Sequence, residues 1–176
     1  PAGQNRTVVM TLLNLLAMAS FAFVTSVTPG PNNLMLLASG ANFGFRRTLP
    51  HMLGISLGMA LLLTCVLGGL GELFSRFPLL QALLRIAGIG YLLWLSWKIL
   101  QTPPRSLQQD TDDARPFAWW QAVLFQFVNP KAWIMAITAV SSFTLAGEAY
   151  WASGMLLVLV FVTINLPAIS VWAGFG

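Results

Sequence analysis

Long apolar segments alternate with short polar stretches along this 176-residue chain. The apolar segments cover approximately residues 12–42, 49–70, 80–100, 117–143 and 151–172. A straight helix needs about 20 apolar residues to cross the hydrocarbon core of a bilayer, and each segment is long enough to do so. The pattern predicts an all-α integral membrane protein with several spans.

Proline interrupts the first and the fourth apolar segments. The first contains Thr-Pro-Gly-Pro-Asn-Asn at residues 28–33, and the fourth contains Asn-Pro-Lys at residues 129–131. Because proline has no backbone N–H, the two prolines of the first interruption are expected to leave the carbonyls near Thr25 and Val27 free, without hydrogen-bond partners. Irregular backbone at membrane depth is tolerated where protein or a watery cavity covers it. The interruptions therefore predict either a binding site or packing kinks, and the sequence leaves both open.

Composition and the placement of charges support the membrane assignment. Hydrophobic residues make up 57% of the chain and charged residues 8%, with a mean hydropathy of +0.76, values that exclude an ordinary soluble domain. The net charge of +4 does not indicate a nucleic-acid partner, because the basic residues are scattered among the connections. They divide unevenly between the two sides of the expected spans: Arg46, Arg47, Lys98, Arg105 and Arg115 on one, Arg6 and Arg76 on the other. The positive-inside rule then predicts a cytoplasmic linker at residues 101–116 and a periplasmic N-terminus.

The order of the segments indicates a duplicated unit. Residues 10–100 would form a first transmembrane repeat of three spans, residues 101–116 a polar linker, and residues 117–176 a second repeat with two spans. Both halves open with a proline-interrupted segment, and interruptions at corresponding positions point to the binding site of a transporter. Repeats of three spans each would be inverted relative to one another. The comparison of the two halves predicts a sixth helix that these 176 residues do not include.

Two half-helices that meet at an interruption offer opposite charges to a ligand. A helix that begins at Pro31 or Asn32 presents unpaired N–H groups and the positive end of its dipole, which suit a carboxylate. A helix that ends near Thr28 presents carbonyl oxygens, which suit an ammonium group. A small zwitterionic amino acid carries both groups. The predicted substrate-binding residues are Pro29, Gly30, Pro31, Asn32, Asn33, Asn129, Pro130 and Lys131.

The remaining titratable residues bear on gating and on coupling to protons. Arg46 and Arg47 are assigned to topology or gating, and His51, the sole histidine, is expected at the membrane interface, with a proton relay as the alternative. Lys131 lies past the middle of its segment, where it either extends to the outer interface or faces a cavity and binds a carboxylate. The carboxylates all fall in connections or at span ends: Glu72, Asp110, Asp112, Asp113 and Glu148. A coupling proton would therefore need His51, Lys131, Glu148, the substrate itself or a segment outside this sequence.

Enzymatic and channel functions were weighed against transport. The sole histidine has no evident serine or cysteine partner, and no cluster of metal-ligating residues is present, so we predict no catalysis, no metal and no cofactor. A passive channel or a non-transporting membrane subunit stays open as an alternative. Gly54 and Gly58 have the spacing that lets helices approach closely, which permits a homodimer.

Four motifs carry a resemblance to a known family. They are Thr-Pro-Gly-Pro-Asn-Asn at 28–33, Gly-Phe-Arg-Arg at 44–47, Ala-Gly-x-x-Tyr-Leu-x-Trp-Leu-x-Trp-Lys at 87–98 and Phe-Val-Asn-Pro-Lys at 127–131. In this order they resemble the LysE/RhtB family of bacterial amino-acid exporters, and most of all its cysteine and O-acetylserine branch. The resemblance implies about six spans and export of small amino acids or derivatives, of the cysteine, O-acetylserine, homoserine or threonine type, across the inner membrane. It also implies a proton gradient as the driving force.

Overall fold

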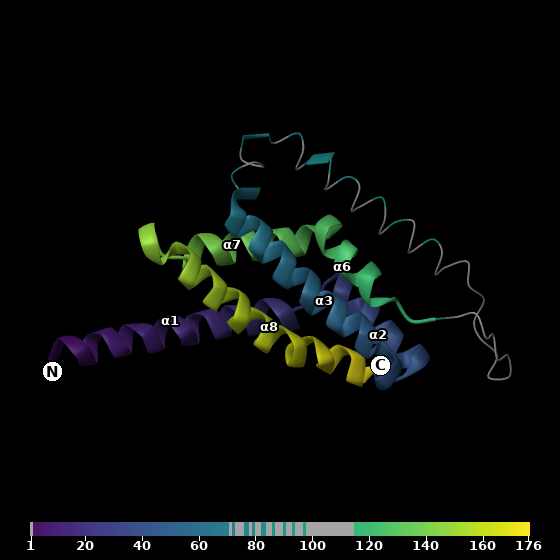
Figure 1. Cartoon of the computed structure of the whole chain (residues 1–176). Helices are drawn as coiled ribbons and strands as arrows, with labels where there is room; N and C mark the ends of the chain where they lie inside the picture. The colour runs from purple at the N-terminus through teal and green to yellow at the C-terminus, as the bar shows by residue number, and fades with distance from the viewer. Residues whose placement is uncertain are drawn as a thin grey trace, which may run out of the picture.

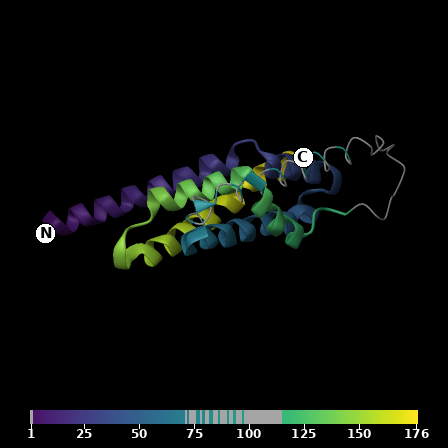
Figure 2. The same ribbon diagram turned by 90° about the horizontal axis from the view of Figure 1, so that it is seen from above.

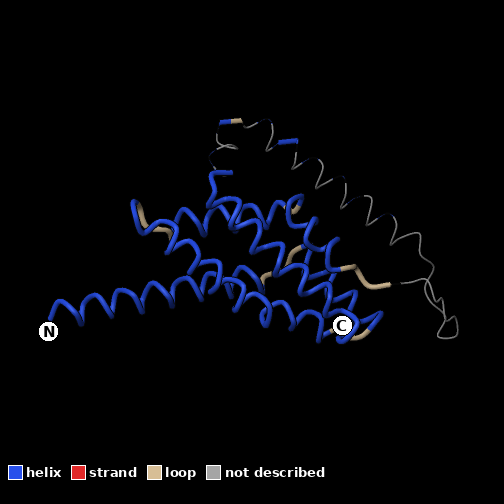
Figure 3. Tube along the Cα trace, in the orientation of Figure 1, coloured by secondary structure: helices blue, strands red, loops and turns tan. Residues whose placement is uncertain are grey.

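The computed structural model describes residues 2–70 and 115–176, with isolated positions between 72 and 97, and describes side chains from residue 12 onward. All regular elements in these described residues are helices (Figure 3). The expected third span at 80–100, with its aromatic motif, and nearly all of the linker at 101–116 lie outside the described residues.

The described helices include two that are long and apolar enough to cross a membrane. They lie at Phe45–Leu70 and Gly147–Phe175, and two bent pairs of shorter helices raise the number to four if each pair is one span. The elements, labelled in part in Figure 1, are α1 (Ala2–Val27), α2 (Pro31–Phe43), α3 (Phe45–Cys65), a π-helical turn η1 (Val66–Leu70), α6 (Trp119–Val128), α7 (Pro130–Phe143), a 3₁₀ turn η2 (Gly147–Ala149) and α8 (Tyr150–Phe175). The prediction of an all-α membrane protein with more than one span is confirmed.

Both proline interruptions break a helix, as the sequence predicts. The axes of α1 and α2 meet at 59°, and those of α6 and α7 at 73°. In each pair the second helix begins at a proline, Pro31 in α2 and Pro130 in α7. Proline suits this position because the first helical residue needs no intrahelical N–H bond. The breaks therefore fix where each new half-helix starts.

The connection between α2 and α3 is shorter than expected. Gly44 alone separates the two helices, with φ of 80° that favours glycine, and its N–H donates to the carbonyl of Gly40. Arg46 and Arg47 are therefore exposed residues in the first turn of α3, which begins at Phe45 and not near residue 49. The expectations that these arginines lie in a connection and that the span begins near residue 49 are wrong.

The two broken helix pairs pass through the bundle in opposite directions, as Figures 1 and 2 show. Helix α3 packs against α6 and α8, and α8 also packs against α1 and α2, so each half of the chain packs on the other. The N-terminal end of α1 extends beyond the other helices (Figure 2). An inverted repeat of three-helix units stays a prediction, because the third helix of the first unit falls outside the described residues.

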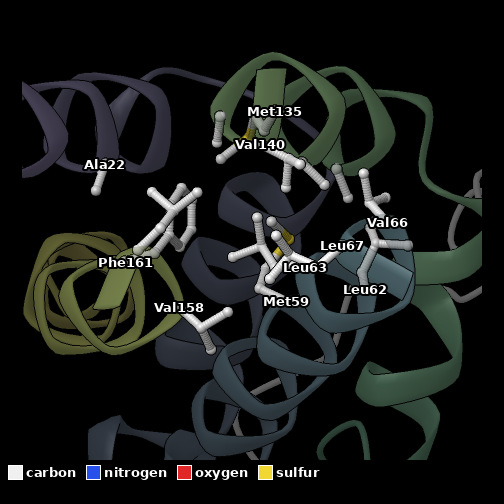
Figure 4. Packing of buried hydrophobic residues seen from close by; sticks show 14 of the residues in the cluster. Ala22, Met59, Leu62, Leu63, Val66, Leu67, Met135, Val140, Val158 and Phe161 are labelled. Atoms are coloured by element: carbon white, nitrogen blue, oxygen red, sulfur yellow. The ribbon is translucent and has the colours of Figure 1, made fainter. Parts of the chain in front are cut away.

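Two apolar clusters hold the described helices together. The larger one joins α1, α3, α7 and α8, and Figure 4 shows Phe161 of α8 pointing toward Ala22 of α1 while Met59 and Leu63 of α3 fill the centre. The smaller joins α2, α3, α6 and α8 around Leu36. Apolar residues also cover the outside of the bundle, where a bilayer would receive them.

The small residues Gly54 and Gly58 serve the contact between α3 and α6. A Cβ atom at Gly54 would collide with the backbone carbonyl of Trp119, and one at Gly58 would lie 2.6 Å from Cγ of Gln126. Such close approach is what small residues at this spacing allow between membrane helices. This glycine face is therefore used within the chain and is not free for a second copy.

Candidate functional site

The two helix breaks meet at one cavity in the middle of the bundle. Its volume is about 20 Å³, which is room for about one water molecule. Side chains from the apolar clusters close one part of it, among them Ile55, Met59, Met135 and Ile169. The polar residues that line it come from both breaks and from α8: Thr25, Ser26, Asn32, Asn33, Asn129, Lys131 and Asn165.

The carbonyls released by the first break are not free. Thr25 O accepts a hydrogen bond from Oγ1 of Thr28 at 3.0 Å, and Val27 O accepts one from the indole Nε1 of Trp172 at 3.0 Å. These are the two carbonyls whose helical donors the prolines remove. The prediction that they lack partners is wrong, because the helix end is capped by side chains, one of them from α8.

Asn33 completes the capping of α1. Its side-chain nitrogen Nδ2 donates to Ser26 O at 2.8 Å and to Thr28 O at 2.7 Å, and the residue is almost fully buried. Asn33 thus folds back from α2 onto the end of α1 and fixes the geometry of the break. Its side-chain donor is used within the protein.

Lys131 reaches across from the second break to the first. Its ammonium Nζ lies 2.6 Å from Thr28 O, 3.0 Å from Thr28 Oγ1 and 3.4 Å from Pro29 O. These oxygens lie at the carboxyl end of α1, where the helix dipole favours a cation. A Cβ atom at Gly30 would come within 2.8 Å of the Lys131 Cδ, so a larger residue here would shift the Lys131 side chain from this path. Of the two alternatives for Lys131, the structure therefore shows the one in which it faces the cavity.

The two half-helices that begin at the breaks differ in their caps. At the second break, Oδ1 of Asn129 accepts the backbone N–H of Lys131 at 3.1 Å and caps α7. At the first, the position before Pro31 is Gly30 in an extended conformation, and no side chain caps α2. The N–H groups of Asn32 and Asn33 lie in the first turn, where a helix supplies no acceptor. The start of α2 is therefore the end that is suited to receive an anion.

Asn32 is held by a residue that the sequence reasoning missed. Its Nδ2 donates to Oε1 of Gln126 at 2.8 Å, and Nε2 of Gln126 donates back to Oδ1 of Asn32 at 3.2 Å. Gln126 is fully buried and also donates to Ala122 O. This reciprocal amide pair ties α2 to α6. The available signal was an amide in an apolar run, three residues before the second break.

A second missed group is a buried chain of three polar side chains. Ser56 Oγ donates to Asn165 Oδ1 at 2.9 Å, and Asn165 Nδ2 donates to Ser26 Oγ at 2.8 Å. All three residues are buried, and they join α3, α8 and α1 beside the cavity. Asn165 is the only amide residue in its apolar segment, which was the signal that could have marked it.

Some residues singled out in the sequence lie elsewhere. His51 is 1% exposed, packs its ring 5.2 Å from that of Phe117 and does not line the cavity. Its position at the membrane interface stays a prediction. Neither of its ring nitrogens has a hydrogen-bond partner among the described residues. Arg46 and Arg47 are exposed at the start of α3, away from the residues that line the cavity. The cavity therefore unites Gly30, Asn32, Asn33, Asn129 and Lys131, while Pro29, Pro31 and Pro130 shape the breaks.

Comparison with known proteins found relatives of similar length. A "Cysteine/O-acetylserine efflux protein" of Shigella flexneri serotype 5b (strain 8401) is 33% identical over 155 residues, covering 87% of this chain and 78% of the relative. The protein of the same name from Escherichia coli (strain K12) has the same identity and coverage. That of Escherichia coli O1:K1 / APEC is 32% identical over 155 residues. No solved structure matches the chain.

A family profile described as "LysE type translocator" matches residues 23–174. The match begins within the last turns of α1 and contains both helix breaks and every residue that lines the cavity. Proteins of this family are translocators and not enzymes, which rules out the intramembrane enzyme. With four sequence motifs in order, breaks that meet at one cavity and this match, the chain belongs to the LysE family of translocators.

Proposed function

We propose that this protein exports small zwitterionic amino acids or their derivatives from the bacterial cytoplasm across the inner membrane. The substrates are of the cysteine, O-acetylserine, homoserine or threonine type, and the relatives named above support this class. The observation that carries the proposal is the meeting of two breaks at one cavity. There an uncapped helix start and a group of carbonyl oxygens lie next to each other.

The two ends of the first break would hold the two charges of the substrate. The carboxylate would bind the N–H groups at the start of α2, where the helix dipole is positive, with the Lys131 ammonium beside it. The ammonium would bind the oxygens at the end of α1. Asn32, Asn33 and Asn129 would position these groups, since each bonds to backbone or side chains at the breaks.

The cavity is smaller than an amino acid, so its lining must move before a substrate binds. A volume of about 20 Å³ holds about one water molecule, so an amino acid enters only when the halves separate. Met59 and Met135 face the cavity from α3 and α7 and would limit the length of the side chain.

Orientation and energy source are part of the proposal. The charge distribution supports a cytoplasmic linker and a periplasmic N-terminus, and a sixth span would complete the second repeat. Export would be driven by the proton gradient. Among the described residues that line the cavity, Lys131 is the only titratable side chain, which makes it the strongest of the carriers considered from the sequence.

Efflux from preloaded cells tests the proposal directly. Cells that make the chain are loaded with radiolabelled cysteine, O-acetylserine, homoserine, threonine or lysine, and efflux is followed with and without an uncoupler. We expect saturable, uncoupler-sensitive efflux of one or more of the small substrates and none of lysine. Flux that neither saturates nor responds to the uncoupler would indicate a channel instead. Absence of efflux, with and without an appended sixth helix, would overturn the proposal.

A further inference from the structure

The ammonium of Lys131 occupies a cluster of oxygens at the end of α1. This α1 oxygen cluster consists of Thr28 O, Thr28 Oγ1 and Pro29 O, which lie 2.6, 3.0 and 3.4 Å from Nζ. A primary ammonium has three N–H donors and no acceptor, so three oxygens satisfy it fully. The α-ammonium of an amino acid presents the same donors with the same charge.

No anion neutralises Lys131 in the described part of the chain. The ion pair found there joins Arg76 to Glu72, on an exposed segment away from the cavity. The residues that line the cavity include no aspartate or glutamate. Within the described residues, the partly exposed ammonium of Lys131 is therefore balanced by carbonyl dipoles and by the end of α1, and removing it from them without a partner would be unfavourable.

We propose that the α1 oxygen cluster is the subsite for the α-ammonium of the substrate, and that Lys131 fills it in the empty transporter. This inference rests on the proposed function. On binding, the ammonium of the substrate replaces that of Lys131, and Lys131 moves to the carboxylate of the same substrate. The movement is short, because Nζ already lies 3.2 Å from where a Cβ of Gly30 would stand, beside the start of α2.

The exchange leaves no charge without a partner. One ammonium replaces another in the cluster, and the displaced one gains a carboxylate, so the number of unpaired charges in the cavity does not rise. An amine without a carboxylate would displace Lys131 and leave it unpaired. An acid without an ammonium would leave the cluster occupied. Recognition therefore requires both groups on one molecule.

The exchange also releases a bond between the two halves. Lys131 follows the second break and Thr28 precedes the first, 103 residues away. While Lys131 holds Thr28, the two broken segments are joined across the cavity, and substrate binding breaks this link. Loading of the site is thereby connected to the separation of the halves that alternating access needs.

Competition binding to the purified, full chain tests the exchange. Radiolabelled cysteine is the probe, and the competitors are cysteamine, which lacks the carboxylate, and 3-mercaptopropionate, which lacks the ammonium. In the wild type we expect both to compete at least about 100-fold more weakly than cysteine, because each leaves a charge unpaired. In Lys131→Met no lysine ammonium fills the cluster. The affinity of cysteamine relative to that of cysteine should therefore rise at least about tenfold, and the relative affinity of 3-mercaptopropionate should not rise.

Three further variants serve as controls and as a second neutral substitution. Lys131→Arg keeps a cation at the cluster and should still exclude cysteamine, whereas Arg115→Met removes an exposed cation distant from the cavity and should behave as the wild type. If Lys131→Met does not purify as a single species, Lys131→Gln tests the same point because its amide is neutral. The proposal is overturned if cysteamine stays excluded from both neutral variants, or if it matches cysteine in the wild type. A wild type that binds none of the small substrates would instead overturn the proposed function.

Discussion

At the scale of single residues, Gly30 is predicted to be essential because of its neighbour and not because of its own backbone. Its φ of −177° is open to any residue, but a Cβ would lie 2.8 Å from the Lys131 Cδ. Gly30→Ala should therefore push Lys131 from its place and lower the initial efflux rate at least about tenfold, since this packing cannot relax without moving the ammonium. The matched control is Gly68→Ala, which meets nothing within 4 Å and should leave efflux unchanged. Wild-type efflux by Gly30→Ala would contradict the close contact.

Asn165 gives a second prediction at this scale. Asn165→Leu removes the hydrogen bonds that join Asn165 to Ser56 and to Ser26, so these two buried hydroxyls lose their amide partner. We expect a loss of about 1 to 2 kcal/mol in stability, at the lower end if the hydroxyls turn to carbonyls of their own helices. The measurement is the thermal unfolding midpoint of the purified protein in detergent. Adding Ser26→Ala and Ser56→Ala should recover most of the lost stability, because these hydroxyls are then no longer left without their amide partner. A triple variant as unstable as Asn165→Leu would contradict the role given to these hydrogen bonds.

The sequence could predict which residues gather at the breaks but not which side chains they pair with. Gly30, Asn32 and Lys131 stand beside prolines, and proline has a local effect that any reader of the sequence can apply. Gln126 and Asn165 each stand within an apolar run. Their partners lie 94 and 139 residues away, at distances that only the folded bundle sets.

At the scale of elements, the start of α2 is predicted to be needed for export and not for insertion. Pro31→Ala combined with Asn32→Ala restores a backbone donor at the break and removes the amide that pairs with Gln126. Efflux should fall at least about tenfold, because the new donor favours a straighter helix and Gln126 loses both bonds to Asn32. Efflux and the amount of protein in the membrane are measured together. The control is Asn42→Ala, on the same helix, whose side chain donates to the carbonyl of Ala38 and bonds to no other described residue. Export retained by the double variant would make the first break a packing kink.

The elements themselves show what local rules can and cannot reach. Proline and hydropathy located both breaks and the extent of α8, since each depends on neighbouring residues alone. The start of α3 was misplaced because adjacent arginines suggested a turn, whereas Gly44 supplies the whole turn with its positive φ. The expectation of unpaired carbonyls at the first break failed for another reason. One of their donors, Trp172, comes from the opposite half of the chain.

At the scale of the whole molecule, the opposite directions of the two broken pairs fix which connections share a side of the membrane. The turn at Gly44 lies at one end of the bundle, and the connection between α7 and η2 lies at the other (Figure 1). Helix α6, which follows the linker in the sequence, begins at the same end as the connection between α2 and α3 (Figure 1). If basic residues keep the linker in the cytoplasm, the connection that contains Ala146 faces the periplasm.

Labelling of single cysteines tests this arrangement in a Cys65→Ser background, which removes the one native thiol. Ala146→Cys, at an exposed residue, should react with a membrane-impermeant maleimide in intact spheroplasts. Gln108→Cys in the linker should react only after the membrane is opened, because the charge bias of five basic residues against two retains that side in the cytoplasm. The reversed pattern would place the linker in the periplasm and would overturn the predicted orientation. Labelling of both sites in intact spheroplasts would mean that α6, α7 and their partners do not cross the bilayer as paired half-helices.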